Sequence, residues 1–194
     1  MRAFLAVLPC LLAAGVVAAA TSTPSKTMTT IPSSPPPTTL QIGDTAPDFT
    51  LPYATRDSVA REPLALSSLI GKGKIVLAFY PADWSGGCTR EVCSFRDNFG
   101  ALGALKADVI GVSGDYVYSH HEWAKFHELP FRLAADHDHA VAKRYGSYNE
   151  ASGYNRRTVF VVDETGKIAY EDLAYSTRDS VSFDKLRSAL KTLQ

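Results

Sequence analysis

Three continuous hydrophobic runs predict the strands of this protein. Residues 74–80 (KIVLAFY), 107–113 (ADVIGVS) and 158–163 (TVFVVD) are apolar at nearly every position, not at every second one. A continuous run of this length is typical of a strand buried on both faces. The turn sequence at 163–166 (DETG) separates the last run from another strand-like segment, which predicts a hairpin.

Helical spacing fills the segments between these runs. Apolar residues three and four apart follow Cys88, and the same pattern near the end of the chain predicts a final amphipathic helix. The segment 119–122 (SHHE) resembles a capping box that opens a helix ending before Pro130. Residues 138–145 predict a short helix that stops at Gly146. The apolar positions are Val92, Phe95, Phe99 and Leu102 in the first helical segment, and Phe183, Leu186, Leu190 and Leu193 in the last. Alternating strands and helices with a late hairpin predict an α/β fold around a central mixed sheet.

The first 40 residues have a different composition. Residues 1–20 place one arginine before an apolar run that ends in three alanines, which is the layout of a secretory signal peptide. An uncleaved membrane anchor is the alternative, because the run is nearly long enough to span a bilayer. Residues 21–40 are mostly Ser, Thr and Pro and predict a disordered linker. We therefore expect one domain over 41–194, exported to the periplasm or secreted, where disulfides persist.

Charge and cysteine content argue against a nucleic-acid-binding protein and against a disulfide scaffold. The 194 residues carry 20 basic and 20 acidic side chains, so the formal net charge is zero and a basic footprint for nucleic acid is absent. Three cysteines, one of them in the predicted signal peptide, are too few for a disulfide scaffold. The two remaining cysteines are therefore candidates for chemistry.

Cys88 lies where a predicted strand gives way to a predicted helix. Free N–H groups and the helix dipole at such a position favour an anion, and in general lower the pKa of a thiol. Gly86 and Gly87 allow a small ligand to approach the backbone, and Ser85 offers a hydroxyl. For a thiol in general, lowering the pKa from about 8.5 to about 6 gives roughly thirtyfold more thiolate at pH 7. The accompanying loss of nucleophilicity leaves a gain of only about a factor of two.

A fast reaction therefore requires a donor aimed at the charge that develops on the group under attack. Arg157, which leads into the third hydrophobic run, is the candidate. Arg156 next to it has the same chemistry, and only the register with the family motif described below favours Arg157.

These residues match a known family. The pattern P-x-x-x-S-x-x-C on Pro81, Ser85 and Cys88 resembles the peroxiredoxin motif, in which the hydroxyl residue is more often threonine. Glu91 and Arg157 fall where that family carries a glutamate and an active-site arginine. The segment C-T-R-E-V-C, which ends at Cys93, is similar to the Q-type or bacterioferritin-comigratory subgroup. The resemblance covers residues 41–193. It implies a thioredoxin-like α/β fold and no cofactor.

The resemblance also implies a mechanism. The Cys88 thiolate attacks a peroxide oxygen and becomes a sulfenic acid, while Ser85, the Cys88 N–H and Arg157 hold the peroxide and Pro81 shields it. Cys93 then condenses with the sulfenic acid to give a disulfide, which an external thioredoxin-like dithiol reduces. The substrates would be hydrogen peroxide and organic hydroperoxides, and the protein would be a monomer.

The two cysteines also allow other interpretations. Residues five apart in an intact helix have Cα atoms about 8.6 Å apart, beyond the roughly 7 Å limit for a disulfide, which argues against a structural bridge. A thiol–disulfide oxidoreductase would favour C-x-x-C, which is absent. Copper chaperones of the Sco type use two cysteines and a histidine, but their cysteine spacing is shorter.

The histidines are not expected to bind a metal, and the aromatic residues near the cysteines are not expected to contact a cofactor. His120 and His121 lie in the capping box, where a solvated or capping role is expected. Tyr80 and Trp84 are expected in the core or the wall of a pocket. The other histidines are His127, His137 and His139.

Overall fold

The computed structural model describes residues 40–193. The predicted signal peptide at 1–20 and nearly all of the predicted linker at 21–40 lie outside the described residues. No helix within 40–193 is long and apolar enough to cross a membrane.

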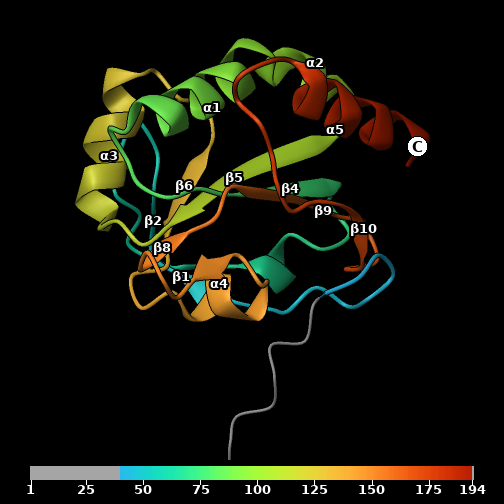
Figure 1. The fold of residues 1–194 in the computed structure, drawn as a ribbon, viewed down its shortest axis with the longest axis horizontal. Coiled ribbons are helices and arrows are strands. Elements are labelled where there is room, and N and C mark those ends of the chain that lie inside the picture. Colours follow the sequence, from blue (N-terminus) through green and yellow to red (C-terminus); the bar gives the residue numbers. More distant parts are fainter. Residues whose placement is uncertain (1–39, 194) are drawn as a thin grey trace, which may run out of the picture. The chain divides into compact units, whose positions relative to one another are not determined.

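A six-stranded mixed sheet lies at the centre of the domain, with the strand order β10-β9-β4-β5-β6-β2 (Figure 1). The strands β4, β5 and β6 are parallel, whereas β2, β9 and β10 join their neighbours antiparallel. The bounds are β2 (Tyr53–Ala54), β4 (Lys74–Phe79), β5 (Ala107–Ser113), β6 (Arg132–Ala135), β9 (Thr158–Val162) and β10 (Ile168–Asp172). The three hydrophobic runs are β4, β5 and β9, and every residue of β4 and β9 is buried. The predicted strands, the hairpin and the mixed α/β sheet are confirmed.

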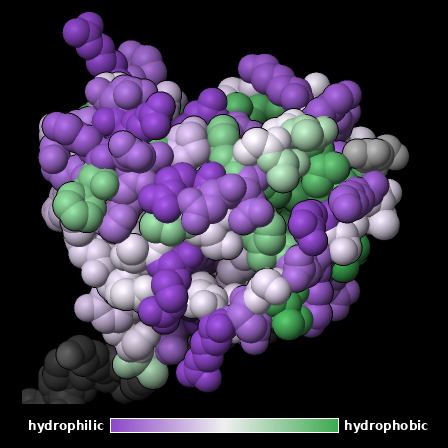
Figure 2. Space-filling model, turned by 90° about the horizontal axis from the view of Figure 1, so that it is seen from above, coloured by the Kyte–Doolittle hydropathy of each residue, from purple (hydrophilic) through white to green (hydrophobic). Residues whose placement is uncertain are grey.

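Helices cover both faces of this sheet (Figure 1). Apolar side chains of α1, α2, α3 and α5 pack in one core cluster, and those of α4 pack in a second cluster on the opposite face. The helices are α1 (Gly86–Asp97), α2 (Phe99–Ala104), α3 (Val117–Phe126), α4 (Ala140–Arg144) and α5 (Val181–Thr192). The outer surface over α1, α2 and α5 is mainly hydrophilic, with hydrophobic side chains gathered toward the side of α5 (Figure 2).

Short elements complete the domain. A two-stranded sheet joins β1 to β3, and a small hairpin joins β7 to β8. Their bounds are β1 (Thr50–Leu51), β3 (Leu64–Ala65), β7 (Tyr148–Asn149) and β8 (Tyr154–Asn155), with a 3-10 turn at Leu66–Ser68. The β7–β8 hairpin directly precedes β9 and leads the chain back toward the cysteine loop.

The structure corrects the predicted helix starts and finds one further central strand. The segment after Cys88 is two helices, because the backbone leaves helical geometry at Asn98. The capping box at 119–122 is wrong: α3 already begins at Val117, and the Ser119 hydroxyl donates to Asp83, 36 residues away. A buried carboxylate from another element competes for that hydroxyl, which local sequence cannot reveal. Strand β6 was not predicted, since its four residues are too few to show a period.

Candidate active site

Cys88 lies in the first turn of α1, directly after the loop that leaves β4. Ser85 is the N-cap of this helix, and its hydroxyl accepts a hydrogen bond of 3.4 Å from the Cys88 N–H. The cysteine is a free thiol and is fully buried. Its sulfur therefore lies at the positive end of a twelve-residue helix, in a site from which bulk water is excluded.

Arg157 contacts Cys88 directly. Its Nη2 lies 3.4 Å from the Cys88 Sγ, and its Nη1 forms an ion pair with Glu91 Oε2. Strand pairing brings it there, because β9 pairs antiparallel with β4 so that Thr158 lies opposite Phe79, where the cysteine loop begins. Arg156, one residue earlier, is exposed. The structure thus places Arg157, and not Arg156, beside the thiol.

Gly87 has no side chain, and the Arg157 guanidinium lies close to where one would begin. A Cβ built on Gly87 would lie 3.0 Å from Arg157 Nη2, tighter than an ordinary van der Waals contact. A Cβ on Gly86 would have only an Arg90 nitrogen nearby, at 3.9 Å. The second glycine is therefore needed for the approach of the arginine, whereas the first has room for a side chain.

Glu91 lies one turn after Cys88 and is completely buried. Its Oε1 has no hydrogen-bond partner among the described residues. Burial raises its pKa from 4.5 to about 7, although the charge of Arg157 opposes this. The folded protein therefore binds this proton more tightly than the unfolded chain does. The stability that this contributes is fully present below pH 4.5 and is lost as the pH rises through about 7.

Two neighbours act on the charge of Arg157. Burial opposes the charged form, but the nearby Glu91 carboxylate and Cys88 sulfur outweigh it and raise the pKa of Arg157. Its backbone is also fixed, since its carbonyl accepts a hydrogen bond of 3.1 Å from the Tyr175 N–H. A permanent cation is thus held at the thiol by both its side chain and its main chain.

Cys93 is a free thiol in the same helix and is half-buried. Its neighbours Val92 and Phe95 belong to the core cluster, but Cys93 does not. With α1 intact, the Cα atoms of the two cysteines are separated by about 8.6 Å on helix geometry, and a bridge requires less than about 7 Å. The two thiols can meet only if the first turns of α1 open.

The other predicted site residues surround the loop. Pro81 opens the loop and is partly buried, and Ser85 closes it. Tyr80 is fully buried, as expected. Trp84 is not in the core: it is 52% exposed and its ring packs 5.7 Å from that of Phe126. Its backbone has a φ of 60°, in the left-handed region.

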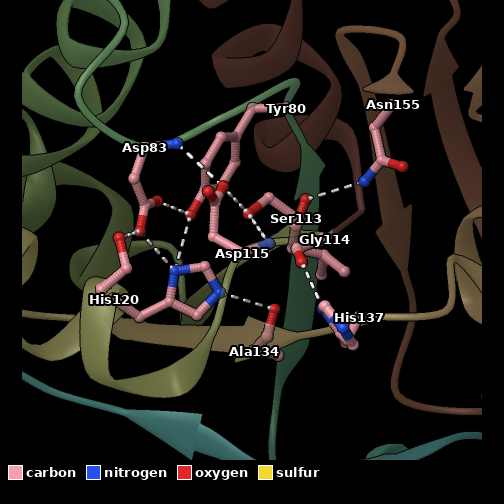
Figure 3. Close-up of polar contacts among 11 residues, drawn as sticks. Tyr80, Asp83, Ser113, Gly114, Asp115, His120, Ala134, His137 and Asn155 are labelled. Atoms are coloured by element: carbon pink, nitrogen blue, oxygen red, sulfur yellow. Dashed lines mark hydrogen bonds and ion pairs between the residues drawn. The ribbon is translucent and has the colours of Figure 1, made fainter. Parts of the chain in front are cut away.

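Sequence analysis missed a buried polar network behind this loop (Figure 3). His120, expected to be solvated or to cap a helix, is fully buried, and its Nδ1 lies 2.9 Å from Asp83 Oδ2. Tyr80 also donates to this carboxylate. The partners are 37 residues apart in the chain. The one signal in the sequence was an aspartate two residues after Pro81, shortly before the cysteine helix.

His121, His137 and His139 have hydrogen-bond partners other than Asp83. His121 Nδ1 lies 2.9 Å from the Thr55 carbonyl oxygen, and His139 Nδ1 lies 2.8 Å from Asn155 Oδ1. Within residues 40–193, no group of three or more His, Cys, Asp or Glu side chains is arranged to hold a metal ion.

The fold and the site define a class of protein. A mixed sheet flanked by helices, a buried thiol at a helix N-terminus and a fixed arginine at 3.4 Å are the features of a thiol enzyme on a thioredoxin-like fold. The AhpC/TSA family profile matches residues 42–171. The chain belongs to this family, the peroxiredoxins, and it is a thiol-dependent peroxidase.

Individual relatives agree with this assignment. The chain is 33% identical over 162 residues to peroxiredoxin Bcp of Bacillus subtilis, covering 80% of this chain and 96% of that one. It is 39% identical over 127 residues to a chloroplastic peroxiredoxin Q of Sedum lineare, covering 65% of each chain. The crystal structure of peroxidoxin BcpB from Mycobacterium tuberculosis matches with a TM-score of 0.70 and 30% identity, covering 80% of this chain and 99% of that one. The predicted family and the thioredoxin-like fold are therefore confirmed.

Proposed function

We propose that Cys88 is the thiol that reacts with peroxide. The observation that carries this is the Arg157 guanidinium, 3.4 Å from a buried sulfur at a helix N-terminus. The thiolate attacks one peroxide oxygen, an S–O bond forms and the O–O bond breaks. The leaving oxygen takes up a proton and departs as water or an alcohol, and Cys88 becomes a sulfenic acid.

Arg157 has two tasks in this scheme. It neutralises the thiolate before the reaction, and its N–H groups face the oxygen on which negative charge develops as the O–O bond breaks. The Cys88 N–H and Ser85 would hold the peroxide from the other side, with Pro81 as a shield. The Ser85 hydroxyl accepts a hydrogen bond from the Cys88 N–H. A peroxide held by the same N–H would therefore have to displace this hydrogen bond.

Cys93 is proposed as the resolving cysteine. Its thiol condenses with the Cys88 sulfenic acid, an S–S bond forms, and water leaves. A thioredoxin-like dithiol then reduces the disulfide. Support comes from its position in the same helix as Cys88 but outside the core cluster, so that opening the first turns of α1 would free its thiol.

The experiment that tests the first step compares two serine variants. Cys88→Ser should abolish consumption of hydrogen peroxide and of an organic hydroperoxide, measured by stopped flow on the reduced protein. Cys93→Ser is the matched control and should still consume one peroxide per chain. Turnover by Cys88→Ser with reductant present would reject Cys88 as the reactive thiol.

We also propose that the domain acts outside the cytosol. The support is the sequence layout of residues 1–20, with one arginine, an apolar run and small residues at its end. N-terminal sequencing of the protein purified from its own cells would test this. A first residue at Thr21, directly after the predicted signal peptide, is expected, and an intact Met1 would contradict cleavage.

A further inference from the structure

Asp83 lies in the middle of the loop that joins β4 to the cysteine helix, and its carboxylate is buried (Figure 3). Three side chains converge on it. Oδ1 accepts a hydrogen bond of 2.8 Å from the Tyr80 hydroxyl, and Oδ2 accepts one of 2.8 Å from Ser119. Oδ2 also lies 2.9 Å from His120 Nδ1. Ser119 and His120 both come from α3, so one carboxylate joins the active-site loop to a helix that carries none of the site residues.

The backbone of Asp83 is held as well. Its N–H donates a hydrogen bond of 2.9 Å to Asp115 Oδ2, and Asp115 is itself fixed by the Ser113 hydroxyl at 2.7 Å. Ser113 is the last residue of β5. The loop is thus anchored twice at one residue, through the main chain to the end of β5 and through the side chain to α3.

The surroundings of Tyr80 and His120 indicate that both groups donate to the Asp83 carboxylate. Burial, with the nearby Asp83 carboxylate, raises the pKa of Tyr80 well above its usual value, so that its hydroxyl keeps its proton and donates. His120 is fully buried between two acceptors, Asp83 on Nδ1 and the Ala134 carbonyl at 3.3 Å on Nε2. An imidazole with its proton on Nδ1 donates to the carboxylate. Asp83 therefore acts only as an acceptor for its three partners.

The segment that follows shows why anchoring is required. Trp84 has a φ of 60°, a left-handed conformation that is unfavourable for a bulky residue and persists only where the surroundings hold it. Its side chain is half-exposed, so packing of the tryptophan ring in the core does not supply the restraint. Ser85, the next residue, must then be at the N-cap to meet the Cys88 N–H.

We propose that Asp83 is a positioning residue for the peroxidase reaction: anchored by His120, Ser119 and Asp115, it holds the loop so that Ser85 caps α1 and Cys88 meets Arg157. This rests on the proposed role of Cys88. Asp83 touches neither the sulfur nor the peroxide. Its effect is on geometry, and a displacement of about 1 Å in a reacting group can cost up to about a hundredfold in rate.

The test measures oxidation of reduced Cys88 by hydrogen peroxide in Asp83→Ala. We expect the rate constant to fall by at least about tenfold. Asp83→Asn should restore most of the rate. Its Oδ1 still accepts from Tyr80, and its amide can donate to His120 Nδ1 once the proton of the ring moves to Nε2.

Asp136 provides the matched control. It is a fully buried carboxylate that accepts backbone N–H bonds from Val141 and Ala142 at the start of α4, on the other face of the sheet. Asp136→Ala should lower the melting temperature but leave the peroxide rate constant within about twofold of wild type. An equal loss of rate in Asp136→Ala at an equal loss of melting temperature would show general destabilisation and overturn the proposal.

Ser119→Ala tests the same anchor with a smaller change than Asp83→Ala. Ser119→Ala removes a single donor to the carboxylate and should slow oxidation by a few fold. Wild-type rates in every folded variant of Asp83 and Ser119 would overturn the positioning role. If Cys88→Ser loses the reaction while the Asp83 and Ser119 variants keep wild-type rates, the proposed role of Cys88 stands and the positioning role of Asp83 is rejected.

Discussion

Replacing Arg157 by alanine tests the chemical core of the site. The substitution removes the fork that joins Cys88 Sγ, at 3.4 Å from Nη2, to Glu91. It leaves a buried carboxylate without its opposite charge. Because burial already raises the pKa of Glu91 to about 7, loss of the cation raises it further and the carboxyl is neutral at pH 7. We therefore expect Arg157→Ala to remain folded.

The expected effect on rate can be bounded from the geometry. At 3.4 Å and an effective dielectric constant of about 20, a guanidinium and a thiolate attract each other by about 5 kcal/mol. Only the part that strengthens as charge moves to the leaving oxygen accelerates the reaction. Loss of one preorganised donor typically costs about 2.7–4 kcal/mol, or roughly a hundred- to a thousandfold in rate. Arg157→Ala should slow oxidation by this factor.

The assay is stopped-flow tryptophan fluorescence of the reduced protein mixed with hydrogen peroxide. Arg156→Ala is the matched control, because Arg156 is exposed and contacts neither the thiol nor Glu91. Its rate constant should equal that of wild type. Arg157→Lys keeps a charge but not the fork, and should be intermediate. Equal rates for the two alanine variants would refute the assignment, and a loss smaller than about tenfold in Arg157→Ala would refute its size.

Further outcomes are expected. With thioredoxin as the only reductant, Cys93→Ser should consume one peroxide and then stall as the sulfenic acid; repeated turnover of this variant would contradict a resolving role. In the wild type, hydrogen exchange in the first turns of α1 should be faster after oxidation than before it. The stability of the wild type should fall between pH 4.5 and about 7 by about 3 kcal/mol from the raised pKa of Glu91 alone. Urea unfolding of Glu91→Gln should lack this component, and an unchanged slope would reject it. Gly87→Ala should displace Arg157 and slow oxidation, whereas Gly86→Ala should retain the rate; equal rates would show that the contact has no effect.

The sequence was sufficient for the long buried strands of the sheet and for the place of the candidate thiol. The strands β4, β5 and β9 are buried on both faces, so each leaves a continuous apolar run that a single sequence displays. Cys88 was placed at a helix start because the strand, the proline break and the glycines lie within a few residues of it. These features are local, and local patterns are visible in sequence.

Features that depend on contact between distant segments could not be predicted in the same way. Adjacent arginines at 156 and 157 have the same chemistry, and only the antiparallel register of β9 against β4 turns one of them toward the thiol. Pairing of Thr158 with Phe79 is the physical reason. A shift of one residue would have turned Arg157 to the other face of the sheet.

The network behind the loop is the clearest case of what only the tertiary structure decided. His120 and Ser119 lie in a segment that resembles a capping box, and sequence analysis assigned them to solvent or to a helix start. Folding instead brings them against the buried carboxylate of Asp83, 37 and 36 residues earlier. A buried carboxylate requires donors, so these side chains turn inward, and neither of them caps the start of α3. The sequence by itself determined the fold and singled out Cys88 as the candidate reactive thiol, whereas packing of α3 against the cysteine loop decided which side chains contact that loop.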